Sequence, residues 1–111
     1  MPYIPKEDRV ALDASIDALA DHLVERAKAG DNEAAFAGLL NYSCTRLALQ
    51  VIRKRFGRMR YWIIAAATGA LRNVADEFYR RVAAPYEDAQ ITKNGDVDLY
   101  AEYDREIQGR K

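Results

Sequence analysis

Residues 61–84 read YWIIAAATGALRNVADEFYRRVAA, and this segment indicates the fold class most clearly. Its apolar residues recur at every third or fourth position, which is the spacing of one face of an α-helix. Away from that face, Asp76–Arg80 and Glu77–Arg81 each place an acid four residues before a base, the favourable order. Pro85 predicts the end of this helix, because the residue before a proline disfavours the α conformation. The apolar face comprises Ile63, Ala66, Ala67, Ala70, Leu71, Val74, Phe78 and Val82.

A first helix is predicted nearer the N-terminus, with Asp13 as its N-cap and a short leading turn over residues 6–12. Gly30 suits the left-handed position that commonly ends a helix. The predicted apolar stripe consists of Ile16, Leu19, Ala20, Leu23, Val24 and Ala27.

A second helix is predicted between Asp31 or Asn32, as a cap, and Gly57, as its end. Gly38 is expected to divide it into a short lead-in and a main helix. The predicted stripe contains Leu40, Cys44, Leu47, Ala48, Val51 and Ile52, whereas a different face carries Ser43, Arg46, Gln50 and Arg53.

The C-terminal part has two interpretations. Asn94-Gly95 is a strong signal for a β-hairpin turn, with Ile91 and Val97 flanking it. Alternatively, a loop precedes a short helix that Asp96 or Asp98 caps, and we favour this interpretation. The sequence therefore predicts an all-α fold: a small bundle of three main helices, a loop-rich C-terminal tail and a short fourth helix.

The composition predicts a thin core and self-association. Among 111 residues, Leu, Ile, Val and Phe supply only 25, whereas alanine supplies 19. Alanine lets helices approach closely but buries little apolar area, so a domain built this way leaves aliphatic and aromatic surface uncovered. Small domains with such cores often gain stability by oligomerisation, and we expect a homo-oligomer.

The charges are balanced in total but not along the chain. Residues 51–81 hold eight basic and two acidic residues, while the segments before and after hold an excess of acids. Either the acidic ends neutralise the basic middle, within one chain or between subunits, or the middle binds an anion.

No signal suggests secretion, membrane insertion or catalysis. A single cysteine, Cys44, excludes an intramolecular disulfide and is expected in the core. The longest apolar run, 61–67, is far shorter than the roughly 20 residues that span a bilayer. His22 is the only histidine, and no nucleotide-binding or metalloprotease motif is present. We expect a soluble, cytoplasmic protein that is not an enzyme and has no metal or cofactor.

Two basic segments are candidates for anion binding. The first is the set Arg53, Lys54, Arg55, Arg58 and Arg60, interleaved with Phe56, Tyr61 and Trp62. Such a segment could bind phosphates and stack bases. In the alternative interpretation it is a helix C-terminus and loop, where cations favour the helix dipole. Duplex nucleic acid is not the expected partner, because the total charge is zero and no helix-turn-helix pattern occurs.

The second candidate is the end of the third helix with a loop that folds back over it. Arg80 and Arg81 are suited to phosphate or carboxylate, and Tyr86 adds a ring and a hydroxyl. In the alternative interpretation, the arginines pair with neighbouring acids and the tyrosines pack. The complete predicted ligand site is Arg80, Arg81, Tyr86, Tyr79, Lys93 and Asn94.

Four strings resemble a family of small uncharacterised proteins from bacteria and their phages: MPYIPKEDR at 1–9, LNYSCTRL at 40–47, EFYRRVAAPYED at 77–88 and NGDV at 94–97. The resemblance covers most of residues 1–97, which we predict to be one helical domain, and it leaves residues 98–111 as an extension. It implies no settled activity. We expect an oligomeric binder of a small phosphorylated or nucleotide-type ligand, and in a phage such a binder would sequester a signalling nucleotide of host defence. The alternative is a structural or regulatory module that binds another protein.

Overall fold

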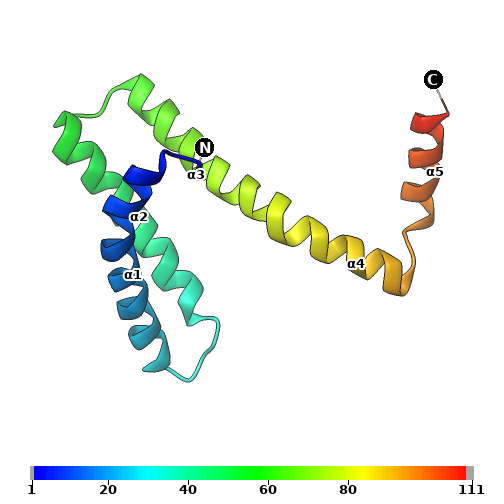
Figure 1. Cartoon of the computed structure of the whole chain (residues 1–111), viewed down its shortest axis with the longest axis horizontal. Helices are drawn as coiled ribbons and strands as arrows, with labels where there is room; N and C mark the ends of the chain where they lie inside the picture. Colours follow the sequence, from blue (N-terminus) through cyan, green and yellow to red (C-terminus); the bar gives the residue numbers. More distant parts are fainter. Residues whose placement is uncertain (1, 110–111) are drawn as a thin grey trace. The chain divides into compact units, whose positions relative to one another are not determined.

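In the computed structural model, which describes residues 2–109, every regular element is helical (Figure 1). This confirms the all-α prediction. The elements are α1 (Lys6–Lys28), α2 (Ala35–Phe56), α3 (Tyr61–Phe78), the π-helical turn η1 (Tyr79–Ala83), α4 (Ala84–Asn94) and α5 (Asp98–Gln108). The chain divides into two compact units, the first ending at Leu71 and the second beginning at Arg72.

In the first unit, α1 and α2 pack side by side as a helical hairpin (Figure 1). The predicted cap at Asp13 is wrong, because α1 begins directly after Pro5 and contains Asp13 in its interior. Nothing in residues 6–12 interrupts the helix, and Glu7 and Asp8 in its first turn favour the positive end of the helix dipole.

The glycines of this unit behave differently from one another. Gly57 has a φ of 79° and ends α2 as predicted. Gly30 does not adopt the left-handed conformation, and α1 ends at Lys28 with Ala29, in the α conformation, as its C-cap. Gly38 does not divide α2, because a glycine inside a helix costs only about 1 kcal/mol relative to alanine. The predicted cap at Asp31 or Asn32 is wrong, because Ala34 occupies the N-cap position of α2. Asn32 lies in the connection before it, where its Oδ1 accepts a hydrogen bond from the Ala34 N–H at 3.0 Å.

The corner between α2 and α3 is built around aromatic rings. The rings of Phe56 and Trp62 pack edge to face with centroids 5.3 Å apart, and the guanidinium of Arg60 lies over both rings. Ile63 follows at 3 % exposure, and it is the one buried side chain of residues 2–109. Cys44 is exposed, so its predicted place in the core is wrong.

In the second unit, the helical conformation continues from Arg72 through Pro85 to Asn94, so the predicted helix end at Pro85 is wrong. The π turn accommodates the proline: the Ala84 N–H bonds to the Tyr79 carbonyl, five residues back, and Pro85 stands in the first turn of α4. A missing N–H is tolerated there, because the first N–H groups of a helix lack partners in it.

The predicted loop over residues 86–94 is consequently also wrong, since these residues form α4. Gly95, with a φ of 88°, ends α4 instead of turning a hairpin. The predicted short final helix is present as α5, although Val97, and neither Asp96 nor Asp98, occupies its N-cap position.

Candidate anion-binding site

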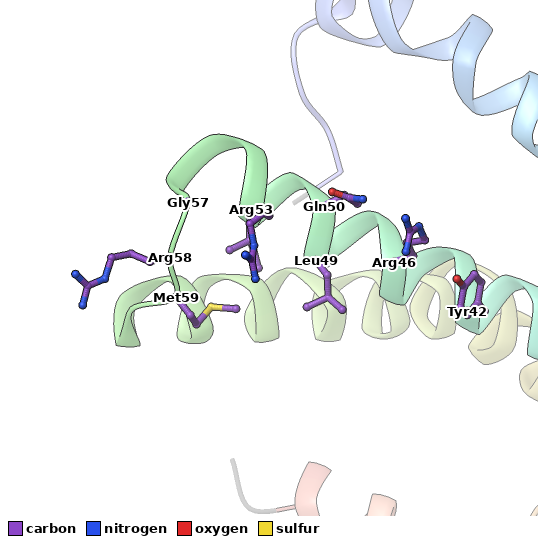
Figure 2. A pocket seen from close by; sticks show the side chains of 9 residues that line it. Tyr42, Arg46, Leu49, Gln50, Arg53, Gly57, Arg58 and Met59 are labelled. Carbon is purple, nitrogen blue, oxygen red and sulfur yellow. The ribbon is translucent and has the colours of Figure 1, made fainter.

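A groove of about 480 Å³ in the first unit collects arginines from α2 and from the turn that follows it (Figure 2). Three of its nine lining residues are arginines, and none is acidic. We call it the arginine groove, and it is lined by Tyr42, Arg46, Leu49, Gln50, Ile52, Arg53, Gly57, Arg58 and Met59.

Helical spacing places most of this groove. Tyr42, Arg46, Leu49 and Arg53 stand at positions i, i+4, i+7 and i+11 of α2, which is one face of a helix. Gly57 then turns the chain through its positive φ, so Arg58 and Met59 line the same groove from the connection. Figure 2 shows the guanidinium of Arg58 extending away from the α2 side chains.

The arginines of the groove keep their charge available for a ligand. Across residues 2–109, no carboxylate lies within ion-pair distance of Arg46, Arg53 or Arg58. Arg53 stands in the last turn of α2, where a cation stabilises the negative end of the helix dipole. A bound anion meets that same negative end, so the arginines must outweigh it.

The six residues of the predicted ligand site all lie in the second unit. Arg80 makes a two-pronged ion pair with Glu77, from Nε to Oε1 at 2.6 Å and from Nη2 to Oε2 at 2.9 Å. This pair spans three residues, and it agrees with the alternative interpretation, in which the arginines pair with neighbouring acids. Arg81 and Tyr86 are exposed, and Lys93 stands in the last turn of α4.

Tyr79 and Asn94 line a different groove, of about 710 Å³, which is acidic. Glu87, Asp88 and Asp96 also line it, and no basic residue does. The Tyr79 hydroxyl donates a 2.5 Å hydrogen bond to Glu87 Oε1, and this bond together with the carboxylate charge raises the pKa of Tyr79. Asn94 Nδ2 donates to Gln90 Oε1 at 3.2 Å.

The returning loop that was expected to close a site over Arg80 and Arg81 is therefore replaced by α4. Anion binding by these two arginines stays a prediction, now without that loop. Sequence reasoning singled out Arg53 and Arg58 and placed Arg46 and Gln50 on one face of α2, but it missed Tyr42. The four-residue step from Tyr42 to Arg46 is the signal that would have added it.

Two other features bear on function. Among residues 2–109, no group of three or more histidines, cysteines or acids is placed to hold a metal ion. Within the same range, none of the helices combines the length and apolar character needed to span a membrane.

Comparison with known proteins gives one match. The family model of a domain of unknown function, DUF6899, matches residues 1–97. No curated protein and no solved structure matches the chain.

Proposed function

Because the chain belongs to the DUF6899 family, whose function is unknown, we propose a function from the groove itself: the protein binds a small phosphorylated or nucleotide-type ligand there. The observation that carries this proposal is the set of three arginines, Arg46, Arg53 and Arg58, which share one groove without an acidic partner.

The chemistry of the groove fits the two parts of such a ligand. A guanidinium donates two parallel hydrogen bonds to a phosphate and keeps its charge at any physiological pH. Leu49, Ile52 and Met59 supply apolar surface, and Tyr42 adds a ring on which a base can stack. A volume of about 480 Å³ lies within the usual range for small-molecule sites.

We propose binding without turnover. The lining residues include no histidine, cysteine, aspartate or glutamate, so the groove lacks the side chains that most often act as a general base or nucleophile. If the chain is encoded by a bacterial virus, as its resemblance to phage proteins suggests, such a binder would act by sequestering a signalling nucleotide made by the host.

Isothermal titration calorimetry with a panel of mono-, di- and cyclic nucleotides tests the proposal. For a nucleotide that binds, Arg46→Ala and Arg53→Ala should each weaken affinity by about 1.5–3 kcal/mol, the value of a hydrogen bond to a charged group. Arg26→Ala, in the last turn of α1 and outside the groove, is the matched control and should bind like the wild type.

Three results would contradict it. The first is that no member of the panel binds, and the second is that the groove variants bind like the control. The third is that Arg81→Ala abolishes binding while Arg46→Ala does not, which would move the site to the second unit.

A protein-binding module is the second candidate, and the exposed apolar surface favours it. Many large apolar side chains are at least half exposed, among them Phe36, Leu40, Val51 and Phe78. If this function is correct and the first is not, the wild-type protein should bind no nucleotide and should self-associate or bind another protein.

A further inference from the structure

The second unit presents an apolar row along its longest helical segment. Val74, Phe78, Val82 and Tyr86 succeed one another at four-residue steps, and each is between 51 % and 66 % exposed. We call these four residues the apolar row. They lie on a single helical segment, so they form a convex surface and no pocket for a small ligand.

The π turn η1 keeps the row on one side of the segment. A step of four residues turns a side chain by about 40° around an α-helix, so the three steps from Val74 to Tyr86 would turn it by about 120°. A π turn adds one extra residue, equivalent to about 100° of rotation. Tyr86 therefore returns to within roughly 20° of the direction of Val74.

Charges of both signs flank the row. Arg81 has no ion-pair partner in the part of the chain that the structure describes, and Glu77 lies four residues before it on the same flank. Glu77 already accepts two hydrogen bonds from Arg80, but each carboxylate oxygen has a further lone pair. When two copies of the helix lie antiparallel, the acid of each copy can face the base of the other, so the pattern is self-complementary.

We propose that the apolar row is the contact face for a second copy of this chain, paired antiparallel about a two-fold axis near Tyr79. This arrangement covers the apolar row of each copy with that of the other. It also sets Arg81 of each copy opposite Glu77 of the other, because an isologous contact forms every interaction twice. The proposal is independent of ligand binding at the arginine groove.

Sedimentation equilibrium of the full chain without ligand, over a range of micromolar concentrations, tests the proposal. The wild type should exceed the 12.6 kDa mass of one chain and approach at least twice that value. Val74→Glu should weaken association at least tenfold, because it buries a carboxylate in the contact. Val10→Glu is the matched control: Val10 is 66 % exposed on α1, and this variant should associate like the wild type.

Circular dichroism should show the same helix content for both variants, since both positions are exposed in one chain. A wild type that remains at the monomer mass would overturn the proposal, and so would equal association of Val74→Glu and Val10→Glu. If the first unit of the same chain covered the apolar row, the wild type would remain at the monomer mass, and the proposal would be overturned in the same way.

A charge exchange tests the antiparallel pairing separately. Arg81→Glu should weaken association several-fold, because it sets an acid of each copy opposite Glu77 of the other. Adding Glu77→Arg should restore association to within about threefold of the wild type. If the double variant associates no better than Arg81→Glu alone, the pairing of Arg81 with Glu77 is overturned.

Discussion

Single side chains distinguish the two candidate anion sites. Arg80 is held by Glu77, whereas Arg46, Arg53 and Arg58 have no carboxylate within ion-pair distance among residues 2–109. The Arg80 side chain is 65 % exposed, so its pair contributes little to stability, about 0.3–0.5 kcal/mol for a pair within one helix. An anionic ligand would form new ion pairs with the arginines of the groove, whereas at Arg80 it would have to compete with Glu77.

The hydrogen bond from Tyr79 to Glu87 predicts a pH dependence of stability. It raises the pKa of Tyr79 above its ordinary 10.0, because ionising the phenol removes the donor and sets a second negative charge beside the carboxylate. A group with a raised pKa in the folded state stabilises the fold below its unfolded pKa, and that contribution is lost as pH rises through the folded value.

Urea unfolding of the wild type and Tyr79→Phe should therefore differ at neutral pH, and the difference should shrink above pH 10. Tyr61→Phe is a matched control, because Tyr61 is exposed and lies outside both the arginine groove and the apolar row. A difference between wild type and Tyr79→Phe that is the same at both pH values would contradict the assignment.

At the scale of the elements, apolar periodicity predicted where α2, α3 and α5 lie and most of α1. It failed where a single residue was read as a boundary. Asp13, Gly30 and Gly38 are compatible with caps or breaks, but the surrounding helix formers continue the helix at two of them, Asp13 and Gly38. Reading Pro85 as a helix end had the largest consequence, because it replaced α4 by a loop. The π turn that accommodates the proline has no sequence signature as clear as the proline itself.

Those boundary errors also explain the limits of the site prediction. The geometry expected around Arg80 and Arg81 included a loop over residues 86–94 that folds back, and these residues form a helix instead. Arg46, Gln50 and Arg53 were found on one face of α2, because that inference depends only on helical spacing. The contribution of Met59 depends on how Gly57 turns the chain, which spacing alone does not give.

Replacing Pro85 tests the role of the π turn. Pro85→Ala restores a backbone N–H and removes the ring that disfavours an α-helical turn before it, so η1 should relax toward α-helix. Helix content by circular dichroism should stay equal or rise, while self-association should weaken, since Tyr86 leaves the apolar row. A loss of helix content, or unchanged association with full helix content, would contradict this account.

At the scale of the molecule, the family model and the contacts divide the chain differently. The model matches residues 1–97 and stops before α5, whereas contacts place the boundary between Leu71 and Arg72. Helix α5 belongs to the second unit and exposes Leu99, Tyr100, Tyr103 and Ile107. We predict that residues 98–111 are dispensable for the fold.

Truncation after Val97 should therefore leave a helical circular-dichroism spectrum, reduced only by the eleven residues of α5. Thermal unfolding of the truncated and full chains, followed in parallel, checks this prediction. A cooperative loss of helix beyond those eleven residues would show that α5 is a core element.

The central claim is that a small anionic ligand binds the arginine groove, and a nuclear magnetic resonance titration tests it most directly. Amide resonances of the full, isotope-labelled chain would be followed while a nucleotide is added to the wild type and to the Arg46→Ala/Arg53→Ala variant. The account predicts saturable shifts clustered on residues 42–59 of the wild type and their loss in the variant. Shifts clustered on residues 77–94, or no saturable shift with any nucleotide, would contradict it.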